Sequence, residues 1–175
     1  MRLTVLFLFC LLALPARAED FLRAPVLMEQ AGVICGIDSA GHAPAPETEA
    51  GEILLVDQSA DIDVETRLVP ARLGLSFGWR LRLQEGASLS GLTIVVRHPP
   101  LGLRGLTEQR WPTELSDRAQ SLDLFKFEYP HELELGTWIL ELRQGDAVLA
   151  RQSFEVVPEW AAIDVIEACF GLVVS

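Results

Sequence analysis

Apolar and polar side chains alternate along residues 136–157, and this alternation constrains the fold more than any other feature of the sequence. On both sides of Gly145, every second position in most of the segment is apolar: Trp138, Leu140 and Leu142, then Val148, Ala150, Phe154 and Val156. A period of two is that of a β-strand with one buried face. The segment therefore predicts an antiparallel hairpin.

The turn of this hairpin decides which residues face each other. The two apolar sets share one face only if the turn has an odd number of residues, so we expect a three-residue turn at 143–145. This register places Leu140 opposite Val148. It also places Gln152 on the apolar face, where it needs either a hydrogen-bond partner or a position at the rim of the core.

Shorter stretches of the same alternation recur upstream. They cover residues 25–36, 51–57, 61–70, 73–84, 92–100 and 121–130, with turn-forming residues between them. Gly32, inside the first stretch, indicates a possible bulge. About seven or eight closely spaced strands predict an all-β fold, a single immunoglobulin-like antiparallel β-sandwich.

Three segments depart from the alternation. Residues 37–50, rich in Ala, Pro and acids, are expected to form an exposed loop. Residues 99–120 are expected to form a long connection between strands. The segment 158–171 predicts a short C-terminal helix, with Pro158 in its first turn and Gly171 just past its end.

The first 18 residues have the pattern of a secretory signal peptide. Arg2 precedes an apolar run over residues 3–14 that is too short to span a bilayer, and the small side chain of Ala18 fits cleavage after that residue. Cys10 raises the alternative of a lipoprotein, but the apolar run continues through it. We expect residues 19–175 to form one domain in the periplasm or outside the cell. Charged residues interrupt every later apolar run, so no membrane span is expected.

The chain is acidic. Its net charge of −11 becomes −13 when residues 1–18, which contain two arginines and no acid, are removed. Proteins bind nucleic acid mainly through Lys and Arg side chains that neutralise phosphates, and Lys126 is the sole lysine. We therefore expect no nucleic-acid partner.

Two cysteines, Cys35 and Cys169, remain after residue 18. In an oxidising compartment they most simply form one disulfide. The alternatives are two free thiols or a nucleophilic thiol, but neither cysteine has a His or Lys nearby in sequence to activate it. The expected bridge would hold the C-terminal helix against the start of the sandwich.

The sequence contains no motif for catalysis or cofactor binding. The nucleophile elbow, the phosphate-binding loop and the dinucleotide fingerprint are all missing. The three histidines, His42, His98 and His131, match no zinc-binding spacing. We assign no catalytic residue, no metal ligand and no cofactor.

One group of carboxylates allows a metal alternative. Asp61, Asp63 and Glu65 lie on one side of a predicted strand, and such a group can bind calcium weakly in extracellular domains. The segment lacks the glycine and the distal glutamate of an EF-hand loop. We favour the interpretation that these residues form the solvent-facing side of a strand.

Our candidate for a ligand or partner surface comprises Arg97, His98, Arg110 and Trp111. Arg97 and His98 precede a stiff Pro99-Pro100 pair, and a cation beside an imidazole on a rigid loop suits an anion or a carboxylate. Arg110 and Trp111 belong to the adjoining connection. The structural alternative is that the prolines only end the strand.

Several motifs together resemble a bacterial family of small exported domains of unknown function. They are GVICG, APETEAG, LVPARLGLSFGWRLRL, VVRHPP, RWP and GTWILELRQGDAVLARQSFEVVP. The resemblance covers about residues 26–158 and implies a sandwich fold, but it brings no activity, cofactor or catalytic residue.

We expect a non-catalytic binding or adaptor module of the cell envelope, with a protein or a small molecule as its partner. One alternative is an envelope enzyme with a site near Arg97 and His98. The other is a calcium-stabilised structural module at Asp61, Asp63 and Glu65.

Overall fold

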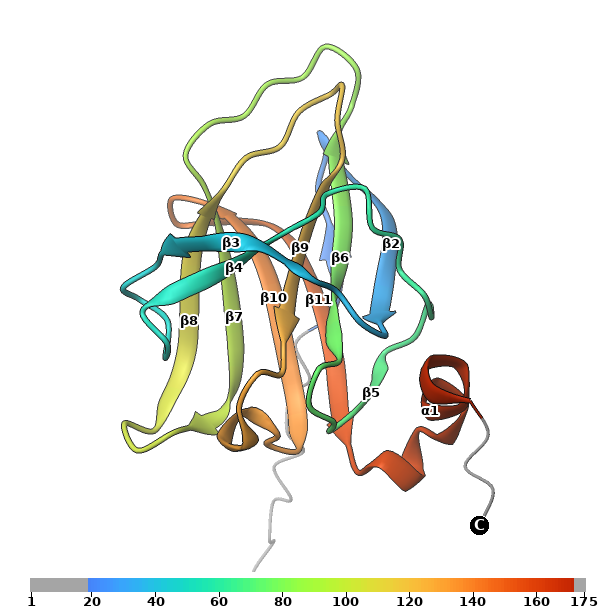
Figure 1. Cartoon of the computed structure of the whole chain (residues 1–175). Coiled ribbons are helices and arrows are strands. Elements are labelled where there is room, and N and C mark those ends of the chain that lie inside the picture. Colours follow the sequence, from blue (N-terminus) through green and yellow to red (C-terminus); the bar gives the residue numbers. More distant parts are fainter. Residues whose placement is uncertain (1–18, 172–175) are drawn as a thin grey trace, which may run out of the picture.

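A computed structural model describes residues 19–171, which form two antiparallel sheets packed face to face (Figure 1). The larger sheet has the order β1 (Phe21–Leu22), β11 (Ala147–Val157), β10 (Gly136–Gln144), β7 (Leu92–Leu101) and β8 (Leu106–Thr113), and β5 (Leu68–Pro70) pairs with β11 in parallel. The smaller sheet has the order β2 (Val26–Ile34), β6 (Ser76–Leu83) and β9 (Ser121–Lys126). The predicted all-β antiparallel sandwich is confirmed.

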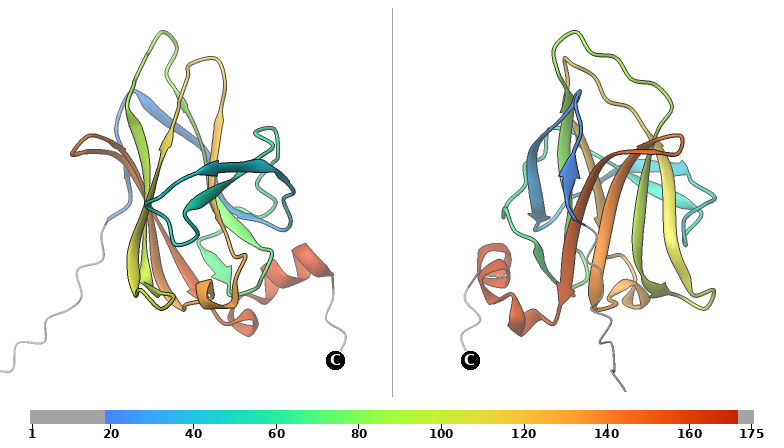
Figure 2. Two further views of the ribbon diagram at one scale, coloured as in Figure 1. Left: turned by 60° about the vertical axis from the view of Figure 1, so that its left-hand side comes forward. Right: turned by 180° about the vertical axis from the view of Figure 1, so that it is seen from behind.

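A separate hairpin covers one side of the sandwich. Its strands are β3 (Ser39–Pro44) and β4 (Glu52–Val56), and both run across β8 and β9 (Figures 1 and 2). Because β8 and β9 are the edge strands of the two sheets, the hairpin lies over the place where the sheets come together without pairing.

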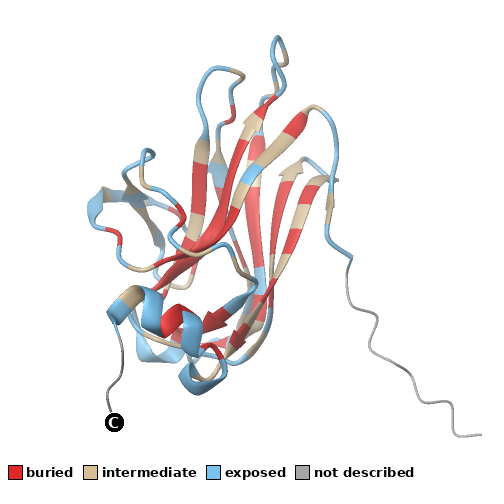
Figure 3. Ribbon diagram, turned by 90° about the vertical axis from the view of Figure 1, so that its right-hand side faces the viewer, coloured by how far each residue is buried: buried red, intermediate tan, exposed pale blue. Residues whose placement is uncertain are grey.

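Aromatic side chains from both sheets fill the core. The ring of Phe77 on β6 lies 5.6 Å from that of Trp138 on β10 and 5.2 Å from that of Phe154 on β11. Figure 3 shows buried and exposed residues alternating along the strands. The alternation seen in the sequence is thus the burial pattern of the sandwich.

The β10–β11 hairpin differs from its predicted register. The turn contains two residues, Gly145 and Asp146, and the strand register shifts at a bulge between Leu142 and Arg143. As a result, Leu140 pairs with Gln152 rather than with Val148. The extra residue needed to bring both apolar sets to one face is therefore in the strand, not in the turn. Gln152 is buried, as predicted, and its amide donates to Asp20 and to the carbonyl of Ser153.

Two segments predicted as loops contain strands. Residues 37–50 include β3, whose side chains alternate only weakly in burial because the ribbon is held by backbone pairing with β4. Residues 99–120 include β8, and β7 continues through Pro99 and Pro100. Conversely, the predicted strand at 61–70 is reduced to β5.

Gly32 is needed for a close contact rather than for a bulge. The bulge of β2 lies between Met28 and Gln30, whereas a Cβ at Gly32 would stand 2.1 Å from the carbonyl oxygen of Val64. The backbone N–H groups of Val33 and Val64 donate to each other's carbonyl oxygens at 2.9 and 3.1 Å. Residues 62–64 therefore pass directly over β2.

The C-terminal segment has the predicted disulfide and a helix that ends where predicted, but the helix begins at Ile163 and Pro158 lies before a separate 3-10 helix. Two short 3-10 helices, η1 (Pro130–Glu132) and η2 (Glu159–Ala161), precede α1 (Ile163–Phe170), and Gly171 follows it. Cys35 and Cys169 are bonded with an S–S distance of 2.02 Å. The predicted signal peptide and its cleavage after Ala18 lie outside the described residues. Within residues 19–171, no helix is long and apolar enough to cross a membrane.

Candidate ligand-binding pocket

Arg97 and His98 lie on opposite faces of β7, because neighbouring residues of a strand point to opposite sides. The Arg97 guanidinium faces outward and lies 3.1 Å from a carboxylate oxygen of Glu108. His98 is only 6% exposed, and its ring centre lies 4.8 Å from that of Trp138. The structure therefore does not place this cation and this imidazole in one site.

Hydrogen bonds hold the His98 ring inside the core. Its Nδ1 lies 2.8 Å from the carbonyl oxygen of Pro99, and its Nε2 lies 3.1 Å from Nε2 of Gln109. This pattern fits a neutral imidazole that donates from Nδ1 and accepts at Nε2. Burial lowers the pKa of His98 and outweighs the opposing effect of the Pro99 carbonyl. Its role here is packing and strand geometry.

Arg110 and Trp111 divide in the same way on β8. The Arg110 guanidinium faces outward beside Glu108 and lies 3.4 Å from Glu47. Trp111 faces inward and is 8% exposed. The four residues predicted as one surface are thus two outward arginines in ion pairs and two side chains inside the sandwich.

Asp61, Asp63 and Glu65 do not form a metal-binding group. Asp63 accepts a hydrogen bond from the backbone N–H of Cys35 at 2.8 Å, and Glu65 accepts one from Gln30 at 3.4 Å. Across residues 19–171, no three His, Cys, Asp or Glu side chains are placed to hold a metal ion. The calcium alternative thus has no support from the geometry.

The outer face of the larger sheet carries an ionic cluster centred on Glu141. This side chain is 1% exposed, and its two carboxylate oxygens lie 2.6 Å from Arg143 and 2.7 Å from Arg151. Burial raises the pKa of Glu141, but the hydrogen bonds from Arg151 and Arg143 outweigh it, so the net pKa is lowered. Each charge here has a partner, so the cluster is a structural feature.

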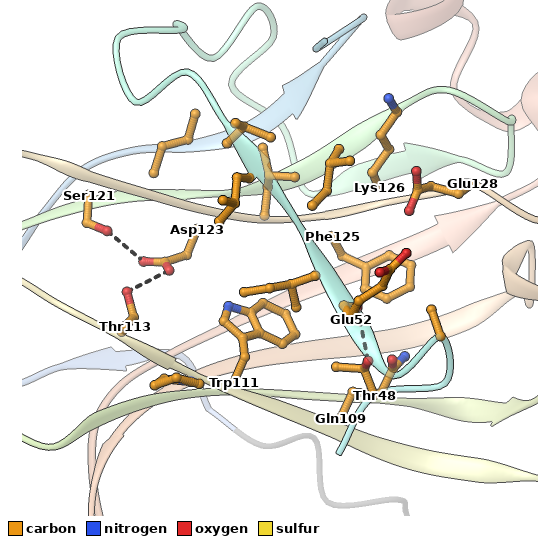
Figure 4. A pocket seen from close by; sticks show the side chains of 18 of the residues that line it. Thr48, Glu52, Gln109, Trp111, Thr113, Ser121, Asp123, Phe125, Lys126 and Glu128 are labelled. Carbon is orange, nitrogen blue, oxygen red and sulfur yellow. Dashed lines mark hydrogen bonds between the residues drawn. The ribbon is translucent and has the colours of Figure 1, made fainter. Parts of the chain in front are cut away.

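A cavity of about 360 Å³ lies where the two sheets meet at β8 and β9, beneath β4 (Figure 4). This volume falls in the range of small-molecule sites. Of the four residues predicted as a surface, Trp111 alone lines it. Its apolar wall is made by Ile53, Leu54, Leu55, Val56, Trp111, Pro112, Leu122, Leu124 and Phe125.

Trp111 brings a free hydrogen-bond donor to the cavity. The residue is more than nine-tenths buried, yet no acceptor within the described part of the chain bonds its indole N–H. In Figure 4 the indole nitrogen lies on the side of the ring that faces Asp123. Unlike the unbonded indole nitrogen of Trp79, that of Trp111 is not fully enclosed by the protein, so its N–H is open to a molecule in the cavity.

Asp123 brings a buried carboxylate to the same cavity. It is 7% exposed, and it accepts hydrogen bonds from Thr113 at 2.8 Å and from Ser121 at 3.2 Å. Burial raises its pKa to about 6, and the two hydroxyl donors only partly oppose that shift. No Lys, Arg or His in residues 19–171 forms an ion pair with it.

Asp123 was not among the residues predicted to form a site, although its position in the sequence is unusual. The residue sits two positions before Phe125 and four before Phe127, so it shares the face of the strand that carries these aromatic side chains. A carboxylate on a buried aromatic face departs from the ordinary pattern of a strand.

Charged groups at the other end of the cavity have their own partners. One carboxylate oxygen of Glu132 accepts hydrogen bonds from the backbone N–H groups of Glu128 at 2.6 Å and Tyr129 at 2.9 Å. Burial raises the pKa of Glu132, and those two N–H groups oppose the rise. The ammonium of Lys126 donates to the carbonyl of Ile37 at 2.9 Å. These contacts fix η1 and the end of β9, and they leave Asp123 as the carboxylate with hydroxyl partners only.

The chain is similar to known proteins over most of its length. Residues 25–156 match the family model described as Domain of unknown function (DUF3859), which confirms the resemblance found in the sequence. A solved structure, that of an immunoglobulin-like protein from Pseudomonas aeruginosa, is 26% identical, with 81% of this chain and 99% of that chain covered and a TM-score of 0.49. Comparison with curated proteins finds no match. The chain therefore belongs to the DUF3859 family.

Proposed function

We propose that the protein is a small-molecule-binding module of the cell envelope and that the cavity beneath β4 is its binding site. The observation that carries this proposal is the side chain of Trp111, which is more than nine-tenths buried, lines a cavity of about 360 Å³ and has an indole N–H with no acceptor among residues 19–171. Binding sites combine a largely apolar wall with a few polar groups that orient the ligand. Trp111, Asp123 and the hydroxyls of Thr113 and Ser121 supply that combination here.

The proposed location is extracytoplasmic, with residues 19–175 as one exported domain. The Cys35–Cys169 disulfide supports it, because such bonds persist in oxidising compartments. The signal-peptide pattern of residues 1–18 supports it independently. A protein of this kind would carry or sense its ligand outside the cytoplasm.

An enzyme at Arg97 and His98 is not proposed, because these side chains lie on opposite faces of β7 and the imidazole is enclosed by Trp138 and Gln109. A general base must reach the proton that it removes. His98 has no such access.

Filling the cavity tests the proposal. Leu54 lines the cavity, so Leu54→Trp is expected to occupy it, whereas Leu103→Trp adds the same ring at a fully exposed turn. Wild-type protein is equilibrated with a small-molecule extract of bacterial envelopes and desalted, and the mass of the protein with any bound ligand is measured by native mass spectrometry. We expect a bound mass in wild type and in Leu103→Trp, and its loss in Leu54→Trp. A mass retained by folded Leu54→Trp, with folding checked by circular dichroism, would contradict the proposed site.

A further inference from the structure

We propose that the ligand is an organic cation whose ammonium or guanidinium group pairs with Asp123 beside the ring of Trp111. This inference rests on the proposed function and gives the ligand its chemical class. It follows from a charge that the protein itself leaves unpaired, from the charges around the cavity and from the aromatic groups in its wall.

Asp123 has no cationic partner among residues 19–171. A buried carboxylate is ordinarily paired with a cation, because removing it from water without compensation is unfavourable. Glu141, a deeply buried acid of the larger sheet, follows this rule with Arg143 and Arg151. Asp123 is 7% exposed and has only two hydroxyl donors. A bound cation would neutralise the carboxylate of Asp123 as the two arginines neutralise that of Glu141.

The charged side chains around the cavity are mostly acidic. Five acidic side chains line it, and the one basic lining residue, Lys126, is held by the Ile37 carbonyl. Arg80, on the neighbouring strand β6, donates to the carbonyl of Gln58 and to Gln120, away from Asp123. The field in the cavity therefore favours cations and opposes anions. The acidic lining residues are Glu52, Glu114, Asp123, Glu128 and Glu132.

Part of the cavity wall is aromatic. The rings of Trp111 and Phe125 both line the cavity, as Asp123 does (Figure 4). Cations bind favourably over aromatic faces, and a tryptophan ring does this best. The indole N–H of Trp111 can also donate to a hydroxyl or carbonyl oxygen elsewhere on the ligand. The three features together describe a site for an amine or guanidine with a short apolar part.

The same chemistry has two sources: a free amine, or a Lys or Arg side chain of another protein. A ring-lined cavity beneath β4 fits a free amine better, because a side chain would have to bring its backbone to the gap between β4 and the sheet edges. Capped lysine, Nα-acetyl-lysine methylamide, distinguishes the two sources.

Three probes of one size and different charge test the inference: n-butylammonium, 1-butanol and butyrate. Binding is followed by two-dimensional ¹H–¹⁵N NMR, in which the four tryptophans give four indole signals and Trp111→Phe identifies that of Trp111. We expect the Trp111 signal to shift with n-butylammonium at a Kd about tenfold or more below that for 1-butanol, and no shift with butyrate. Capped lysine is expected to bind more weakly than n-butylammonium.

Asp123→Asn is the decisive variant, with Asp146→Asn as its matched control in the exposed β10–β11 turn. Both remove one negative charge, but only the first changes the cavity. We expect Asp123→Asn to reduce n-butylammonium binding to the level of 1-butanol while 1-butanol binds unchanged. Asp146→Asn should behave as wild type. In wild type, the Kd for n-butylammonium should rise about tenfold for each pH unit below pH 6, as protons compete for Asp123.

The outcomes separate this inference from the proposed function. Equal binding of all three probes at the Trp111 signal would leave a ligand pocket and overturn the cationic ligand. Binding of n-butylammonium that survives Asp123→Asn would overturn the role of Asp123. Failure of every probe to shift the Trp111 signal would overturn both. Binding of capped lysine as tight as that of n-butylammonium would keep the cation and overturn the free amine as its source.

Discussion

Replacing Asp123 with Asn is expected to make the ligand-free protein more stable at neutral pH, although it removes the group that we assign to binding. Burial raises the pKa of Asp123 from 3.8 to about 6 in the folded protein. At about 1.36 kcal/mol for each pKa unit, ionising this side chain lowers the free energy of unfolding by about 3 kcal/mol at pH 8. Asn has the same shape and no charge, and its amide can still bond to the hydroxyls of Thr113 and Ser121.

The gain should depend on pH with a definite sign. The folded state holds the proton of Asp123 more tightly than the unfolded state, so the stabilising effect of that proton is complete below pH 3.8 and is lost as the pH rises through 6. Relative to wild type, Asp123→Asn should therefore gain about 3 kcal/mol at pH 8 and less than about 1 kcal/mol at pH 4. Urea unfolding followed by circular dichroism between pH 4 and pH 8 measures both values, and Asp146→Asn controls for overall charge.

A loss of stability in Asp123→Asn at pH 8 would refute this reasoning. It would mean that the carboxylate stabilises the junction of β8 and β9 through its hydrogen bonds more than its burial destabilises the fold. A gain that stays constant across the pH range would also refute it, because only ionisation gives the difference its pH dependence.

Three further predictions concern the framework around the pocket. Cys169→Ser should lower the free energy of unfolding by up to about 5 kcal/mol, since the bond to Cys35 closes a loop of 134 residues; reduced wild type should match it in urea, and an unchanged midpoint would contradict this. Glu141→Gln should lower the free energy of unfolding by about 3 kcal/mol at pH 7, measured in the same way, by leaving two partly buried arginines without their carboxylate. The difference in free energy of unfolding between wild type and Glu141→Gln should shrink as the pH falls below 4.5, because Glu141 then becomes protonated in the unfolded and, at lower pH, in the folded state. A difference that stays constant with pH would contradict this prediction. Gly32→Ala should lower the melting temperature strongly and Gly36→Ala only slightly, because a Cβ meets a carbonyl oxygen at the first position and nothing within 4 Å at the second.

Alternation of side chains was enough to predict the sandwich, and the residue types near the C-terminus and the two cysteines predicted the helix and the disulfide, but the exact pairing of strands could not be predicted. The hairpin at residues 136–157 shows why. The requirement for one extra residue was correct, yet a bulge beside Leu142 satisfies it as well as a longer turn does. β3 and β8 were missed because a ribbon pair and an edge strand have little apolar periodicity, and Pro112 is tolerated where no partner strand needs its N–H.

The pocket was only partly predictable. Trp111 was selected as a residue of a long connection between strands, whereas it lies on β8 and faces inward. Arg97 and His98 are adjacent in sequence and therefore point apart on a strand, which the expected loop at Pro99 concealed. The place of Asp123 on an aromatic strand face could be read from the sequence, but its role in a site depends on β8 and β9 facing each other, and the sequence carries no local sign of that contact between separate sheets.

The hydrogen bond from Thr113 to Asp123 joins the edge of one sheet to the edge of the other, where the described backbone of β8 and β9 forms no ladder. A ligand bound at the junction of β8 and β9 would add contacts between two sheets that otherwise meet there through side chains alone. Amide protons along β8 and β9 should then exchange with solvent more slowly in the presence of the ligand. Binding could thus be detected by hydrogen exchange at backbone positions that do not contact the ligand.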